Sequence, residues 1–77
     1  MMFMKLGSLA SNPNKVRILN LVLKKELTLD SIAKAVRVPK IALTSLLNEM
    51  VKDGFIEEKE GVYRITEEGK KALKNLK

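Results

Sequence analysis

The sequence predicts a mainly α-helical domain that carries one small β-hairpin. Two observations predict this class: apolar residues recur at helical spacing in several segments, and two short alternating segments flank Glu60-Gly61. The chain has 77 residues, of which 45% are hydrophobic and 31% charged, values typical of one folded domain. We therefore expect a single domain over residues 1–77, with residues 1–11 as an N-terminal segment.

Helix-start residues divide the first half of the chain into segments. A short helix is expected over residues 2–10 and a longer one over residues 13–25, which begins at Asn12-Pro13, a typical cap and first-turn pair. Residues 26–28 should form an extended link, because Thr28 then caps a second helix that ends at Val36. After the turn Arg37-Val38, Pro39 opens a third helix that ends near residue 53.

A hairpin and a last helix complete the prediction. Residues 55–59 and 62–66 alternate in polarity across the two-residue turn, which ends in glycine. Thr66 then caps a helix with acidic residues in its first turn and lysines towards its end, so that both ends suit the helix dipole. The core should contain the apolar residues of the helices, among them Ile32, Ala33, Val36, Leu43, Leu46, Leu47 and Met50. A domain of this size does not readily cover a further apolar set, which consists of Phe3, Leu6, Leu9, Leu73 and Leu76.

The order helix, short strand, helix, tight turn, helix, hairpin and helix is that of a winged helix-turn-helix. Four segments resemble ArsR/MarR-type winged-helix transcription regulators, namely residues 9–19, 27–33, 49–56 and 63–70. Residues 27–33, for example, are similar to their Leu-Thr-x-x-x-Leu-Ala pattern, and residues 63–70 to Tyr-x-Leu-Thr-x-x-Gly-Arg. The resemblance implies a transcription regulator that binds DNA, and a homodimer formed through the first and last helices.

The chain departs from that family in three places. Many relatives have a glycine in this turn, where the backbone takes a positive φ, but this chain has Arg37. Either Arg37 adopts that conformation at a cost of about 1 kcal/mol, or the turn differs. The predicted wing is short and acidic, with Glu57, Glu58 and Glu60 around Lys59. The chain has neither Cys nor His, so the metal sensing of some family members is not expected, and we predict no metal and no cofactor.

Positive charge is concentrated in the first part of the chain. The formal net charge is +6, and residues 1–48 hold eight basic and only two acidic residues, whereas residues 49–77 hold seven of each. Such asymmetry marks a face that meets a polyanion, and we expect duplex DNA.

Helical periodicity places a polar face on the third helix. If Leu43, Leu47 and Met50 face the core, the side chains opposite them point outward and can contact DNA. Lys15 and Arg17 on the first long helix are expected to reach a flanking phosphate. The predicted DNA-binding residues are Lys34, Arg37, Pro39, Lys40, Ile41, Thr44, Ser45 and Asn48, with Arg64 on the hairpin, where it can also offset the acidic residues.

Other functions fit the sequence less well. A winged helix that binds protein is the alternative, since the wing is acidic and the third helix lacks arginine. No nucleophile–base pair is evident without His or Cys, so we do not expect an enzyme. No apolar run is long enough to span a membrane, and no start resembling a signal peptide is seen, so we expect a cytoplasmic protein without membrane contacts.

Overall fold

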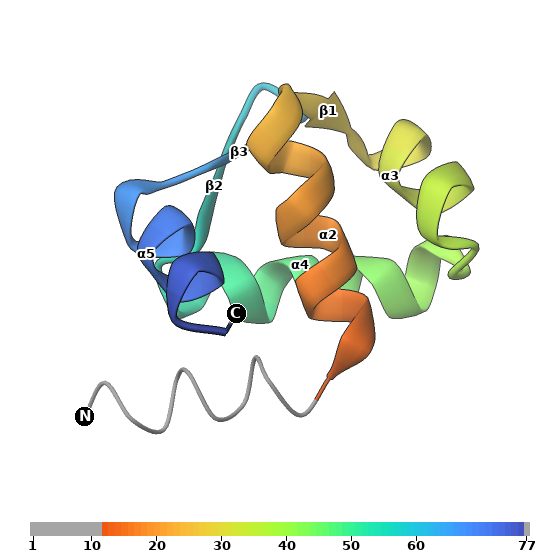
Figure 1. Ribbon diagram of the computed structural model, residues 1–77. Coiled ribbons are helices and arrows are strands. Elements are labelled where there is room, and N and C mark those ends of the chain that lie inside the picture. Colours follow the sequence, from red (N-terminus) through yellow and green to blue (C-terminus); the bar gives the residue numbers. More distant parts are fainter. Residues whose placement is uncertain (1–11, 77) are drawn as a thin grey trace.

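Four helices and three short strands make up residues 12–76, the part of the chain that the computed structural model describes (Figure 1). In chain order they are α2 (Pro13–Lys24), β1 (Leu27–Thr28), α3 (Leu29–Val36), α4 (Lys40–Lys52), β2 (Ile56–Lys59), β3 (Val62–Ile65) and α5 (Glu67–Leu76). These elements confirm the predicted order. The helix expected over residues 2–10 lies outside the described residues.

The three strands form one antiparallel sheet in the order β1-β3-β2. Strands β2 and β3 are the predicted hairpin, and both residues of its turn, Glu60 and Gly61, have positive φ (53° and 81°). The expected extended link forms β1, which completes the sheet: Leu27 pairs with Tyr63 of β3, and Thr28 with Val62. This pairing joins the segment before α3 to the wing.

Side-chain caps begin three of the helices, as the sequence predicts. Asn12 Oδ1 accepts a hydrogen bond from the Asn14 N–H at 3.0 Å at the start of α2. Thr28 Oγ1 accepts from the Ser31 N–H at 3.3 Å, and Thr66 Oγ1 from the Gly69 N–H at 3.0 Å. Each bond satisfies one of the N–H groups that a helix start leaves without a partner.

The helices and the start of the hairpin enclose one hydrophobic core. Leu43, Leu47 and Met50 are fully buried on one side of α4, which confirms the predicted core face of that helix. Leu46 and Ala33 are half-buried and pack against the core from its margin, so neither is as central as expected. The buried hydrophobic residues are Ile18, Leu19, Val22, Ile32, Val36, Leu43, Leu47, Met50, Phe55, Ile56, Ala72 and Leu73.

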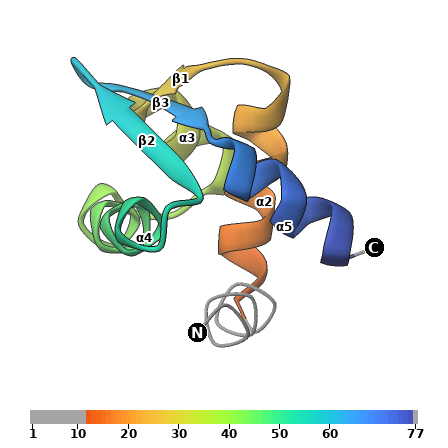
Figure 2. The same cartoon turned by 90° about the vertical axis from the view of Figure 1, so that its left-hand side faces the viewer.

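Viewed along its axis, α4 lies on one side of the molecule, the β2–β3 hairpin extends on that same side, and α5 lies on the other (Figure 2). Helix α2 crosses between them, with α3 beside its second half (Figure 1). Among residues 12–76, no helix has the length and apolar character needed to cross a membrane. The arrangement leaves the outer side of α4 uncovered by other described elements.

Arg37 ends α3 in the left-handed conformation, with φ 56° and ψ 43°. Its backbone N–H donates to the Ala33 carbonyl at 2.9 Å, which closes the last turn of the helix. A residue with a Cβ pays about 1–2 kcal/mol for this conformation, which glycine adopts freely. Of the two alternatives that the sequence left open, the structure shows the first: the turn keeps a positive φ although it lacks glycine.

Gly69, in α5, lies against the start of the hairpin. A Cβ at this position would collide with the backbone carbonyl oxygen of Phe55 and come within 2.7 Å of Ile65 Cγ1. The Phe55 carbonyl cannot easily move, because it accepts a hydrogen bond from the Thr66 N–H at 3.0 Å. The close packing of α5 on the sheet therefore requires glycine here.

Candidate nucleic-acid interface

The outward side of α4 carries the residues that the sequence predicts to meet DNA. Ile41, Thr44, Ser45 and Asn48 are all exposed, because the opposite side of the helix is buried in the core. Ile41 is 90% exposed, an unusual position for a large apolar side chain. Together these residues form a continuous face with one apolar and three polar side chains.

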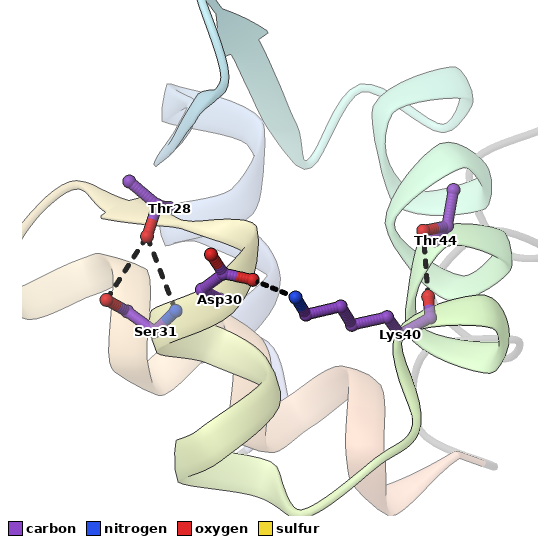
Figure 3. Close-up of polar contacts among 5 residues, drawn as sticks. All are labelled: Thr28, Asp30, Ser31, Lys40 and Thr44. Carbon is purple, nitrogen blue, oxygen red and sulfur yellow. Dashed lines mark hydrogen bonds and ion pairs between the residues drawn. The ribbon is translucent and has the colours of Figure 1, made fainter.

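Lys40 opens this face and is paired with Asp30 of α3. Its Nζ lies 2.5 Å from Asp30 Oδ1, and the two side chains remain 63% and 68% exposed (Figure 3). The hydrogen bond from the Lys40 ammonium, with its positive charge, lowers the pKa of the Asp30 carboxyl. This pair could not be predicted from the sequence, because the two residues are ten positions apart and belong to different helices.

Thr44 bonds back to its own helix. Its hydroxyl donates to the Lys40 carbonyl at 2.8 Å, so the hydroxyl proton is already in use (Figure 3). Thr44 can therefore accept a hydrogen bond from a ligand more readily than it can donate one. At the start of the neighbouring helix α3, the hydroxyl oxygens of Thr28 and Ser31 lie 3.2 Å apart.

The turn between α3 and α4 is basic and exposed. Lys34, Arg37 and Pro39 all have exposed side chains there. Within residues 12–76, neither Lys34 nor Arg37 has an ion-pair partner within 4.0 Å. Both cations are thus available to a phosphate group close to the start of α4.

The hairpin differs in charge from this turn. Glu57, Glu58, Lys59 and Glu60 are exposed along β2 and its turn. Arg64 of β3 is held between two carboxylates, with its Nε 2.5 Å from Glu57 Oε1 and an Nη 3.6 Å from Glu26 Oε2. Glu57, with Glu26 beside it, raises the pKa of the Arg64 guanidinium. Arg64 therefore offsets acidic residues of the wing, and a phosphate would have to compete with them.

Lys15 does not lie on the surface, although this was predicted from the sequence. It is buried, with 3% of its surface exposed, and its Nζ forms an ion pair with Glu49 Oε1 at 2.7 Å. It ties α2 to α4 and cannot reach a flanking phosphate, whereas Arg17 of the same helix is exposed. The Lys15 ammonium lowers the pKa of the Glu49 carboxyl, chiefly through the hydrogen bond. The prediction for Lys15 was wrong because helical periodicity alone did not reveal that α4 covers this position.

These features define a winged helix-turn-helix protein: α3 and α4 form the helix-turn-helix, and β2 and β3 form the wing. Residues 15–77 match the family model described as "Winged helix-turn-helix". The chain belongs to that family, and the fold class predicted from the sequence is confirmed. No curated protein matches the sequence significantly.

Two solved structures share the fold over nearly the whole chain. The transcriptional repressor BigR from Xylella fastidiosa superimposes with a TM-score of 0.78 at 18% identity, covering 96% of this chain and 78% of its own. HlyU from Vibrio cholerae N16961 superimposes with a TM-score of 0.79 at 20% identity, covering 97% of this chain and 87% of its own. At the level of fold, these similarities confirm the resemblance to winged-helix transcription regulators.

Proposed function

We propose that this protein binds duplex DNA through α4 and the basic α3–α4 turn, and that it acts as a transcription regulator. The observation that carries the proposal is the exposed face of α4, which begins beside the exposed cations Lys34 and Arg37. In helix-turn-helix docking, the start of the second helix contacts base edges while flanking residues contact phosphates. That BigR is a transcriptional repressor supports the regulatory role.

The wing contributes little to the proposed interface. Its exposed residues include Glu57, Glu58 and Glu60, whose carboxylates repel phosphate. Its cation Arg64 is engaged with Glu57 and Glu26. The binding energy should therefore come from the first half of the chain, which carries the net positive charge.

The test is a titration of fluorescent random-sequence duplex DNA at several salt concentrations, read by anisotropy and checked by gel shift. We expect binding at low salt that weakens steeply as salt rises, because each neutralised phosphate contributes about −0.9 to the slope of log K against log salt. Absence of binding at low salt would reject the proposed function.

Matched single-charge variants locate the contact. Lys34→Ala and Arg37→Ala should each weaken binding to most sequences and reduce the magnitude of the salt slope by about 0.9 per lost phosphate contact. Lys59→Ala removes the same charge from the wing and should change little. The reverse ranking, with Lys59→Ala dominant, would place the contact on the wing.

A protein-binding winged helix is the second candidate. The acidic exposed side chains of β2 and the 90% exposed Ile41 favour it. If the protein binds a protein partner instead of DNA, it should have no affinity for duplex DNA at low salt. In that case Ile41→Ala should weaken binding of the protein partner.

A further inference from the structure

The outer face of α4 points to a particular base. Resting on the proposed function, we propose that Ile41 contacts the C5-methyl group of a thymine, so that the bound DNA site has a T·A pair opposite the start of α4. Ile41 is the second residue of α4, in the part of a recognition helix that usually enters the major groove first.

The exposure of Ile41 is the first observation behind this inference. Its side chain is 90% exposed, whereas Leu43 and Leu47 on the opposite side of α4 are fully buried, so the core does not use Ile41. An isoleucine in this position gains free energy only when a partner covers it. On the major-groove edges of the four bases, thymine presents the one methyl group, and an apolar side chain is its natural contact.

The second observation concerns guanine, the base most often read by Arg or Lys. Helix α4 spans Lys40–Lys52 and contains no arginine. The Lys40 ammonium near its start is paired with Asp30 Oδ1 at 2.5 Å (Figure 3). A guanine contact by Lys40 would have to displace that carboxylate, so the start of α4 is poorly equipped to read guanine.

The other exposed residues of the α4 face are compatible with a thymine contact by Ile41. Thr44 donates its hydroxyl proton to the Lys40 carbonyl, and so offers an acceptor and its own methyl group. Ser45 and Asn48 are exposed on the following turn, and an asparagine amide can pair with adenine. The face is thus arranged for T·A pairs.

The experiment begins with selection of bound sequences from a random duplex pool. Each thymine of the selected site is then replaced singly by deoxyuridine, which removes only the methyl group. We expect the wild-type protein to lose about fourfold in affinity at one thymine, the value of one buried methyl group. Ile41→Ala should bind the thymine and deoxyuridine probes equally, whereas Ser45→Ala, on the same face, should keep the fourfold ratio.

The outcomes separate this inference from the proposed function. An unchanged melting temperature for Ile41→Ala, expected from its exposure, shows that the variant is folded. Equal wild-type affinity for every deoxyuridine probe, a selected site without thymine, or an Ile41→Ala variant that keeps the fourfold ratio would overturn the inference while leaving DNA binding intact. No binding to any duplex at low salt would reject the proposed function, and the inference with it.

Discussion

Asp30 and Lys40 form an ion pair of 2.5 Å between the first turns of α3 and α4, on the surface that we propose to face DNA. The Asp30 carboxylate is an anion in contact with the Lys40 ammonium, as a DNA phosphate would be in the proposed complex. Because both side chains are largely exposed, the pair contributes little to the stability of the fold. If DNA binds this surface as proposed, a phosphate has to compete with Asp30 for Lys40.

Asp30→Asn should therefore strengthen non-specific DNA binding. The substitution frees Lys40 and removes a negative charge that faces the phosphates, so the salt slope should become steeper by about 0.9. Anisotropy titrations over a salt series measure both effects. Glu67→Gln is the matched control, because it makes the same charge change on α5, which lies on the other side of the molecule from α4 (Figure 2). Like Asp30, Glu67 is paired with a lysine, since its Oε2 lies 3.5 Å from Lys70 Nζ. Equal effects of both variants would show that net charge alone is responsible.

The Lys15–Glu49 pair should make stability depend on pH. The ion pair lowers the pKa of Glu49 in the folded state. Its stabilisation is therefore fully present above the ordinary glutamate pKa of about 4.3 and is lost as the pH falls through the lower pKa of the folded protein. Chemical denaturation from pH 7 to pH 3 should show a smaller loss of stability in Glu49→Gln than in the wild type. The two curves would run parallel if the pair were not responsible.

Arg37→Gly should separate stability from binding. Glycine relieves the left-handed strain at φ 56° and should raise the free energy of unfolding by up to about 1 kcal/mol, partly offset by glycine's larger entropy when unfolded. The lost cation should at the same time weaken DNA binding. Denaturant titration and anisotropy measure the two quantities, and Arg37→Ala, which loses the charge but keeps the strain, is the control. A less stable Arg37→Gly variant would contradict the assignment of strain.

Gly69→Ala should destabilise the protein, although alanine normally favours a helix by about 1 kcal/mol over glycine. The added methyl group meets the Phe55 carbonyl and Ile65 Cγ1, so α5 must move away from the sheet. We expect a loss of about 1–3 kcal/mol, typical of overpacking. Thermal and denaturant unfolding measure it. A gain in stability would mean that α5 can shift without cost.

The homodimer inferred from the sequence remains a prediction, and part of its basis has changed. Leu73, expected as an uncovered apolar residue, is 5% exposed and belongs to the core of the single chain. Phe3, Leu6 and Leu9 lie outside the described residues. We expect light scattering to give twice the monomer mass, and deletion of residues 1–8 to return the monomer. A dimer that survives this deletion would exclude the N-terminal segment as the contact.

Short-range chemistry explains what could be predicted from the sequence. Thr28 and Thr66 cap their helices through bonds that span three residues, and the hairpin turn rests on the positive φ of Glu60 and Gly61. The exposed face of α4 followed from the period of its apolar residues. Such interactions lie within a few residues of one another, so the order of amino acids determines them and, with them, the winged helix-turn-helix fold.

The tertiary structure decided which basic side chains are paired with a carboxylate and which are exposed to a ligand. Lys15 and Arg17 are alike in the sequence, yet α4 brings Glu49 over Lys15 and leaves Arg17 exposed. The crossing of α3 and α4 likewise brings Asp30 to Lys40. These partners are 34 and ten residues apart, and their contact depends on how whole helices pack. Periodicity assigns a residue to one side of its helix, but only packing determines what covers that side.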